Sequence, residues 1–184
     1  GLSTGPHLHF EIYAGGEAVD PLRLAAEAQP SIGAGEADKL VSRIIRVESA
    51  GDPNAANPMS SARGLGQFLD ETWMRMIRAY RPDIARSMSR DQALDLRFDP
   101  QIATEMLHRF TAENEADLRR AGHQASAGNL YLAHFLGSAG ANHVLSAAPE
   151  TPLSDLLDSR VISANSFLYG HDAAWVINWA ARKM

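Results

Sequence analysis

The 184-residue chain contains no cysteine, which excludes disulfides, thiolate-bound metal sites and cysteine nucleophiles. It also lacks an apolar run of about 18 residues, the length that a membrane-spanning helix requires. The net charge of −5 comes from interspersed acids and bases, so neither a nucleic-acid groove nor a polybasic membrane surface is indicated. What is present, 45% hydrophobic and 21% charged residues, is typical of a globular protein with a sizeable core.

One stretch divides the sequence into two parts. Residues 26–35 are rich in Ala, Gly and Pro without hydrophobic periodicity, which predicts a linker. Before it, polar and apolar residues alternate over 7–14, which predicts a β-strand, and a turn follows. After it, helical periodicity prevails. We therefore expect a mainly α domain at 36–184, preceded by a short β segment at 1–25.

Periodicity and helix-end residues set the helices expected in the main domain. Asp99 followed by Pro100 is typical of a helix start, because Asp caps the first turn and Pro fits the first helical position. Asp70 is the expected N-cap of another helix, after a loop at 51–66 that is rich in Gly, Pro, Asn and Ser. The expected helices cover about 36–50, a segment from Asp70, 89–98, 100–120, 127–136, 139–147, 151–158 and 172–183.

Glu48 continues the apolar face of the first expected helix. It follows Ile44 and Ile45 at i+4 and i+3, the spacing that also joins these residues to Val41. Periodicity leaves two interpretations open: an acid at a frayed helix end that turns to water, or a carboxyl held against apolar walls. In the second case desolvation favours the protonated form. Such a carboxyl can act as a general acid near neutral pH, which glycoside cleavage requires.

The residues that follow favour the second interpretation. The segment "ESAGDPNAANPMSSARGLGQFLDETW" resembles the signature of the bacterial lytic transglycosylase (SLT) family: Glu-Ser at a helix end, an Asn/Pro/Ser-rich loop, Gly-x-x-Gln and a further helix. The resemblance implies a lysozyme-like, goose-type/SLT helical fold and an enzyme that cuts peptidoglycan with Glu48 as its catalytic acid. Glycines let a backbone approach a ligand closely, and a Gln can bond a sugar N-acetyl group. The substrate-binding residues of this loop would be Ser61, Gly64, Gln67 and Phe68.

The resemblance extends over about residues 36–184, with one departure. Where the family carries Ala-Tyr-Asn-x-Gly, this sequence reads Ala-His-Phe-Leu-Gly at 133–137, so His134 replaces the tyrosine and Phe135 the asparagine. Tyr131 lies three residues earlier on the same helical face and can supply a phenol instead. We therefore expect Tyr131 and His134 to contact substrate as well.

The N-terminal segment "GLSTGPHLHFEIYAGGEAVDPLRL" resembles the last strand and turn of lysostaphin-type zinc metallopeptidases, which cut peptidoglycan cross-links. That resemblance makes His9 a zinc ligand and His7 a catalytic residue. The family's other ligands come from upstream strands, and no other histidine here is followed by an acid at i+3 or i+4. We therefore expect residues 1–25 to be a remnant of a peptidase domain, and the chain to have no metal and no cofactor.

Other polar candidates near Glu48 have simpler explanations. Asp52 precedes a proline in a turn, and Asp70 and Glu71 occupy a helix start, where acids are favoured. Arg63, in the Gly-rich loop, either meets carboxylates of the polymer or is solvated. The three tryptophans at helical spacing are expected in the core rather than as sugar platforms: Trp73, Trp175 and Trp179.

These features predict cleavage of the β-1,4 bond between N-acetylmuramic acid and N-acetylglucosamine. The resemblance implies a lytic transglycosylase: Glu48 protonates the glycosidic oxygen and then takes a proton from the muramic 6-hydroxyl, which closes a 1,6-anhydro ring. A hydrolytic muramidase with the same glutamate is the alternative, and a non-catalytic peptidoglycan-binding or assembly module is a third. We expect a monomer that acts on glycan strands in the periplasm, cell envelope or extracellular space, without a nucleic-acid partner or a membrane span.

Overall fold

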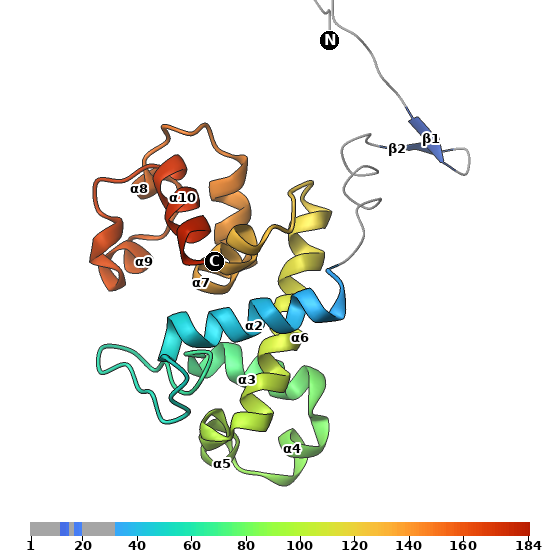
Figure 1. Ribbon diagram of the computed structural model, residues 1–184, viewed down its shortest axis with the longest axis vertical. Coiled ribbons are helices and arrows are strands. Elements are labelled where there is room, and N and C mark those ends of the chain that lie inside the picture. Colours follow the sequence, from blue (N-terminus) through green and yellow to red (C-terminus); the bar gives the residue numbers. More distant parts are fainter. Residues whose placement is uncertain (1–11, 15–16, 20–31) are drawn as a thin grey trace, which may run out of the picture.

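The computed structural model describes residues 12–14, 17–19 and 32–184 of the chain (Figure 1). Strands β1 (Ile12–Ala14) and β2 (Glu17–Val19) form an antiparallel pair in which Ile12 lies opposite Val19. Strand β1 covers the end of the strand expected at 7–14. His7, His9 and most of the expected linker lie outside the described residues.

The described main part is helical, as the sequence predicts. In chain order it contains α2 (Ala34–Ser49), α3 (Asp70–Tyr80), α4 (Pro82–Ser87), α5 (Arg90–Asp95), η1 (Leu96–Phe98), α6 (Pro100–Arg120), α7 (Ala127–Ser146), α8 (Leu153–Leu156), α9 (Ser159–Ala164), η2 (Ser166–Leu168) and α10 (Ala173–Lys183). The expected mainly α class is confirmed.

Two helix starts show how local chemistry sets these bounds. The Asp99 carboxylate accepts hydrogen bonds from the backbone N–H groups of Gln101 and Ile102, at 2.8 and 3.0 Å, and Pro100 is the first residue of α6. The predicted cap is confirmed. Asp70, in contrast, was the wrong choice as N-cap of α3: it is the first helical residue, and Leu69 precedes it without a side-chain cap bond.

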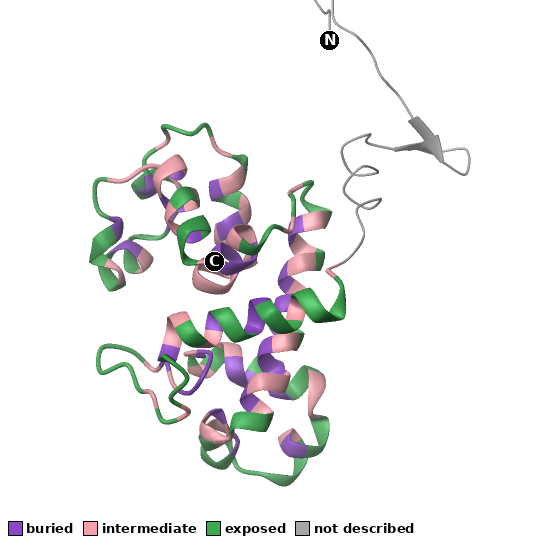
Figure 2. Ribbon diagram, in the orientation of Figure 1, coloured by how far each residue is buried: buried purple, intermediate pink, exposed green. Residues whose placement is uncertain are grey.

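Helix α2 crosses the molecule between two groups of helices, with α3, α4 and α5 on one side and α7 to α10 on the other (Figure 1). We call the second group the C-terminal lobe. Buried segments line the inner faces of both groups (Figure 2). The largest fully buried side chains of the first group and of α2 and α6 are Ile44, Trp73, Met76, Ile77, Met106, Leu107 and Leu118. The expected core position of Trp73 is confirmed.

Helix α7 is interrupted at Gly137, whose backbone angles (φ 75°, ψ 156°) are not helical. A left-handed φ is easily adopted only by glycine, because a Cβ would meet the following backbone. The two helical halves correspond to the separate helices that the sequence predicts at 127–136 and 139–147. The break fixes the direction in which the first half of α7 meets the end of α2.

Candidate active site

Glu48 occupies the last turn of α2, half-buried, where the chain leaves the helix. The helix ends sharply because Ala50 and Gly51 both adopt left-handed backbone angles, with φ of 54° and 85°. The buried Ser49 hydroxyl donates to the Ile45 carbonyl at 2.9 Å and so holds this last turn in place. The carboxyl therefore lies at a fixed position on the inner face of the helix, not at a frayed end.

Tyr131, on the first half of α7, brings a phenol to this carboxyl. Its side chain is buried, and its hydroxyl lies near enough to Glu48 for the two groups to interact. Burial raises the pKa of the Tyr131 hydroxyl, and the interaction with the negatively charged Glu48 raises it further. The phenol therefore stays protonated and is able to donate to the carboxylate form of Glu48.

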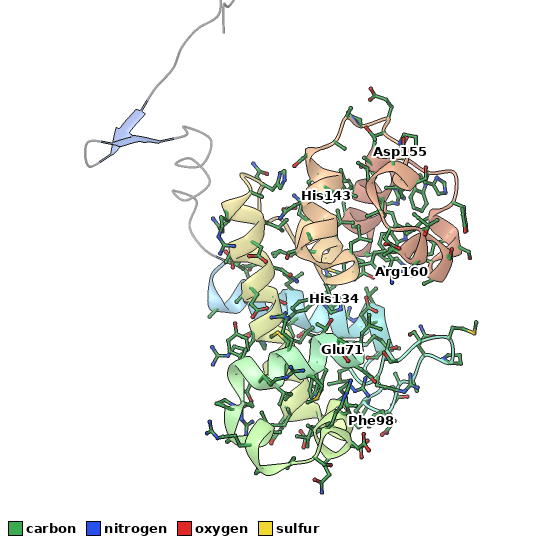
Figure 3. The ribbon with its side chains drawn as sticks, turned by 180° about the vertical axis from the view of Figure 1, so that it is seen from behind. Glu71, Phe98, His134, His143, Asp155 and Arg160 are labelled. Atoms are coloured by element: carbon green, nitrogen blue, oxygen red, sulfur yellow. The ribbon has the colours of Figure 1, made fainter. Side chains whose placement is uncertain are left out.

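His134 joins α7 to the glycine-rich loop, and it lies between the C-terminal lobe and α2 (Figure 3). Its Nε2 is 3.1 Å from the Gly66 carbonyl oxygen, which only accepts hydrogen bonds, so Nε2 carries the proton. Its Nδ1 is buried and has no hydrogen-bond partner among the described residues. Burial lowers the pKa of His134, against the opposing effects of the Glu48 charge and the Gly66 bond. The imidazole is thus neutral near pH 7.

The imidazole of His134 is fixed on several sides by other rings. It stacks nearly parallel to Tyr131, with an interplanar angle of 15° and 6.4 Å between ring centres. Phe110 and Phe68 meet it edge-on at 5.7 and 6.2 Å. Phe68 itself is buried, so this predicted substrate contact lies behind the loop and supports the imidazole from inside.

The glycine-rich loop is held by Gln67, whose backbone has a left-handed φ of 47°. Its side-chain Nε2 donates to the carbonyl oxygens of Gly64 and Ala55, at 2.9 and 3.2 Å. Both amide hydrogens are therefore used within the protein, and only Oε1 remains to accept a hydrogen bond from a ligand. Strained non-glycine backbone of this kind is most often found at functional sites.

Arg63 holds the tip of the same loop through one of its guanidinium nitrogens. One guanidinium nitrogen, Nη1, donates at 2.8 to 2.9 Å to the carbonyl oxygens of Asn57, Ser60 and Ala62. Nη1 is therefore used within the protein, whereas the N–H groups of Nε and Nη2 have no acceptor among the described residues. The role of Arg63 is to stiffen the loop at 57–63.

Arg97 anchors the loop from beneath, and sequence reasoning missed it. Its buried Nη1 donates to the Ser61 carbonyl at 2.7 Å, to the Phe68 carbonyl at 3.2 Å and to the Asp70 carboxylate at 2.6 Å. This ion pair uses the Asp70 carboxylate, which explains why it does not cap α3. One sequence signal could have indicated that Arg97 is buried: it follows the buried Ala93 by four residues and so continues the same helical face.

The loop glycines are required by contacts inside the protein. A Cβ on Gly64, whose φ is 74°, would lie 2.0 Å from the Arg97 carbonyl oxygen. A Cβ on Gly66 would lie 3.0 Å from the Phe68 ring and 3.1 Å from Leu107. The close backbone approach expected at these glycines is thus made to the protein's own core. The predicted Ser61 likewise faces inward, where its hydroxyl accepts the backbone N–H of residue 70 at 3.3 Å.

The other acids that are near Glu48 in sequence each have a partner of their own. Asp52 accepts the backbone N–H two residues onward at 2.9 Å, which confirms its turn role. Asp70 is paired with Arg97, and Glu71 with Arg90 at 2.6 Å on the surface. The glutamate of α2 is therefore the carboxyl that remains for proton transfer at this site.

Two negative findings concern only the part of the chain that the structure describes. Residues 12–14, 17–19 and 32–184 contain no group of three or more His, Asp or Glu side chains arranged to hold a metal ion. Over the same residues, no helix has both the length and the apolar character needed to cross a membrane.

These features are typical of one class of enzyme, the lysozyme-type glycosidases: a helical fold, a glutamate next to a tyrosine, and a rigid glycine-rich loop. Glycosidases of the lysozyme type cleave with a carboxyl held in partly apolar surroundings. Comparison with known families agrees: residues 31–122, half of the chain, match the Transglycosylase SLT domain, and the protein belongs to that family. Members are lytic transglycosylases that cleave glycosidic bonds of peptidoglycan in the periplasm or cell envelope. The chain is thus a peptidoglycan-cleaving enzyme with a lysozyme-like fold.

The match ends at residue 122, before α7. Glu48 and the glycine-rich loop lie inside the matched segment, whereas Tyr131 and His134 lie beyond it. These two residues nevertheless bring α7 next to Glu48 and Gly66.

Proposed function

We propose that the enzyme cleaves the β-1,4 bond between N-acetylmuramic acid and N-acetylglucosamine as a lytic transglycosylase, with Glu48 as its single catalytic carboxyl. The protonated carboxyl gives its proton to the glycosidic oxygen as the C1–O bond breaks. The resulting carboxylate takes the proton of the muramic 6-hydroxyl, and O6 bonds to C1 to close a 1,6-anhydro ring. The glutamate ends protonated and no water is consumed.

The observation that carries this proposal is that the first three acids after Glu48 in the sequence each have a partner of their own. An inverting hydrolase needs a second carboxylate about 6.5–9.5 Å from the first, and a retaining one needs a nucleophile at about 5–5.5 Å. Asp52, Asp70 and Glu71 are committed to a turn or to arginines. A single glutamate is sufficient for attack by the 6-hydroxyl of the same sugar, which also gains from proximity.

Tyr131 and His134 support the glutamate through this cycle. The Tyr131 hydroxyl donates to the carboxylate after the first proton transfer and so limits the cost of a half-buried negative charge. His134 fixes the loop opposite through its bond to Gly66. Of the residues expected to bind substrate, Gln67 retains one free acceptor, whereas Ser61, Gly64 and Phe68 act by shaping the loop.

One observation favours hydrolysis as a second candidate. Because Nδ1 of His134 is an unpartnered acceptor beside the Glu48 charge, it is suited to orient a water molecule. In a muramidase that water would replace the 6-hydroxyl as the nucleophile. For the remainder of the chain we propose the division expected from sequence, with residues 1–25 a peptidase-like segment, 26–35 a linker whose last two residues already belong to α2, and 36–184 the catalytic domain.

The substitution Glu48→Gln tests the catalytic assignment. An amide of the same shape cannot donate the proton, so turnover on purified peptidoglycan should fall by about 10²- to 10⁴-fold, the usual contribution of a general acid, with unchanged thermal stability. Glu71→Gln is the matched control: it removes an exposed carboxyl, bonded to Arg90, and should leave turnover intact. A Glu48→Gln enzyme that keeps more than about a tenth of wild-type turnover would refute the assignment.

Product analysis separates the two candidate reactions. Digestion in ¹⁸O-labelled water, followed by mass spectrometry, should give 1,6-anhydromuropeptides without the heavy isotope. Reducing muramic ends that carry one ¹⁸O would instead identify a muramidase. Either product leaves the role of Glu48 as proton donor in place.

A further inference from the structure

A series of touching aromatic rings leads away from Glu48 into the C-terminal lobe. Tyr131, which contacts the glutamate, lies 5.6 Å from Trp179, measured between ring centres. Trp179 in turn lies 5.0 Å from Phe135 and 5.2 Å from Phe167. Phe167 continues to Trp175 at 6.3 Å. We call these five side chains the aromatic row.

The aromatic row passes from the interior to the surface. Tyr131 is buried, Phe135, Trp175 and Trp179 are half-buried, and Phe167 is 42% exposed. The expectation that Trp175 and Trp179 belong to the core is therefore only partly correct. Helix α9, which η2 with Phe167 follows directly, lies on the same side of the molecule as the C-terminal end of α2 (Figure 1).

The exposed ring is held in place rather than free to turn. Phe167 contacts the rings of Phe135, Trp175 and Trp179, so three neighbours fix its orientation. Trp175 is itself held by His171, whose ring stacks on it with 3.6 Å between ring centres and an interplanar angle of 8°. A rigid aromatic surface next to a catalytic group loses little conformational entropy on binding and is therefore preorganised for a ligand.

We propose that the aromatic row binds the glycan strand at sugars beyond the bond that Glu48 cleaves. This inference rests on the proposed function. Pyranose rings present flat faces of C–H groups, and aromatic side chains supply the matching apolar area while tolerating the polar rim of a sugar. The row reaches the site through Tyr131, whose ring stacks on the His134 imidazole that bonds the Gly66 carbonyl. It lies entirely in the segment after residue 122, outside the matched family domain.

A positive charge next to the Trp179 indole favours acidic glycans at the aromatic row. The Lys183 ammonium lies 5.7 Å from the Trp179 ring centre, and within the described residues no acidic side chain pairs with it. Peptidoglycan strands carry carboxylates on their muramic acids and peptides. An aromatic surface with a free ammonium therefore suits an acidic glycan better than a neutral one.

The test measures equilibrium binding of purified, uncrosslinked glycan strands to the full chain carrying Glu48→Gln, which prevents cleavage during the measurement. Tryptophan fluorescence reports binding directly, because Trp175 and Trp179 are half-exposed. Adding Phe167→Ala should weaken binding of long strands about 3- to 10-fold, as expected for the loss of an aromatic contact. Adding Phe167→Leu, which keeps apolar volume without a ring, should weaken it to a similar extent.

Met88→Ala is the matched control, because Met88 is 41% exposed, almost as much as Phe167, and lies between α4 and α5 in the other group of helices. It should bind strands as tightly as the parent. In the same titration Lys183→Gln should weaken binding of peptidoglycan strands and leave binding of neutral chitin oligosaccharides unchanged. Circular dichroism and thermal unfolding verify that each variant is folded.

The outcomes separate this inference from the proposed function. Unchanged strand affinity in a folded Phe167→Ala variant overturns the inference, even if the glutamate proves essential. A concentration-dependent dimer that Phe167→Ala abolishes overturns it too, because the row would then bind a second copy. If strands bind through the row but Glu48→Gln in the otherwise wild-type chain still cleaves them, the catalytic assignment fails and the binding surface stands.

Discussion

Arg97 offers the most direct test of how the site is held, through substitution by methionine. The change keeps most of the side-chain volume but removes the guanidinium, which bonds the Ser61 and Phe68 carbonyls and the Asp70 carboxylate. The glycine-rich loop and the start of α3 then lose their common anchor. We expect lower stability and, because the same loop faces Glu48, slower cleavage.

The magnitude follows from burial. Breaking a buried ion pair costs about 3–5 kcal/mol, because the remaining charge stays desolvated. The side chain of Arg97 is 8% exposed and that of Asp70 34%, so water can reach the carboxylate in part and the lower end applies. We therefore expect Arg97→Met to lower the free energy of unfolding by about 3 kcal/mol, a large part of the total for a domain of this size.

A second ion pair provides the control. Arg90 and Glu71 are also joined at 2.6 Å, but their side chains are 48% and 82% exposed. Exposed pairs contribute about 0–1 kcal/mol, so Arg90→Met should change stability by no more than that. Urea unfolding followed by circular dichroism measures both variants. Removing the orphaned charge as well, in Arg97→Met with Asp70→Asn, should recover part of the loss. Equal losses in Arg97→Met and Arg90→Met would refute the anchoring role.

Two further predictions concern the loop and its contact with α7. Gly64→Ala should lower the free energy of unfolding by about 3 kcal/mol, because the alanine would be left-handed and its Cβ would lie 2.0 Å from the Arg97 carbonyl oxygen. Gly122→Ala, also left-handed (φ 84°) but in open space, should cost only about 1 kcal/mol. Equal costs in urea unfolding would contradict this difference. Because burial lowers the pKa of His134, the unfolded chain binds this proton more readily, and stability should fall as the pH drops below about 6.5, by up to about 1.4 kcal/mol per unit. Unfolding measured from pH 7.5 to 5.5 should show a shallower slope for His134→Gln than for the wild type, and equal slopes would contradict this.

Local signals were sufficient for the long helices. Helix α6 begins where Asp99 and Pro100 predict it, and α2 follows the spacing of Val41, Ile44 and Ile45. The six-residue helices α4 and α9 were missed, because two turns carry too little periodicity to distinguish them from loops. The two helices expected at 127–136 and 139–147 are the two halves of α7, which is interrupted at Gly137.

The site was less accessible to sequence reasoning because its contacts join distant segments. Spacing on one helix face placed Tyr131 beside His134, and family resemblance placed both near Glu48. Nothing in the sequence indicated that Arg97 would reach Ser61 and Asp70, 36 and 27 residues away. An arginine on a short helix predicts a solvated charge, and only the folded loop supplies the carbonyls that make burial favourable.

The break in α7 also affects how this enzyme can change over evolution. An unbroken helix would pass any rotation or shift of its distal end to Tyr131 and His134. The non-helical Gly137 interrupts that transmission, and the following segment is fixed separately, since the Ser138 hydroxyl donates to the Asp117 carboxylate on α6 at 2.8 Å. Shifts in the second half of α7, after residue 138, are therefore not passed along the helix axis to Tyr131 and His134. A designer who wishes to graft another glycan preference onto this scaffold should place the junction there.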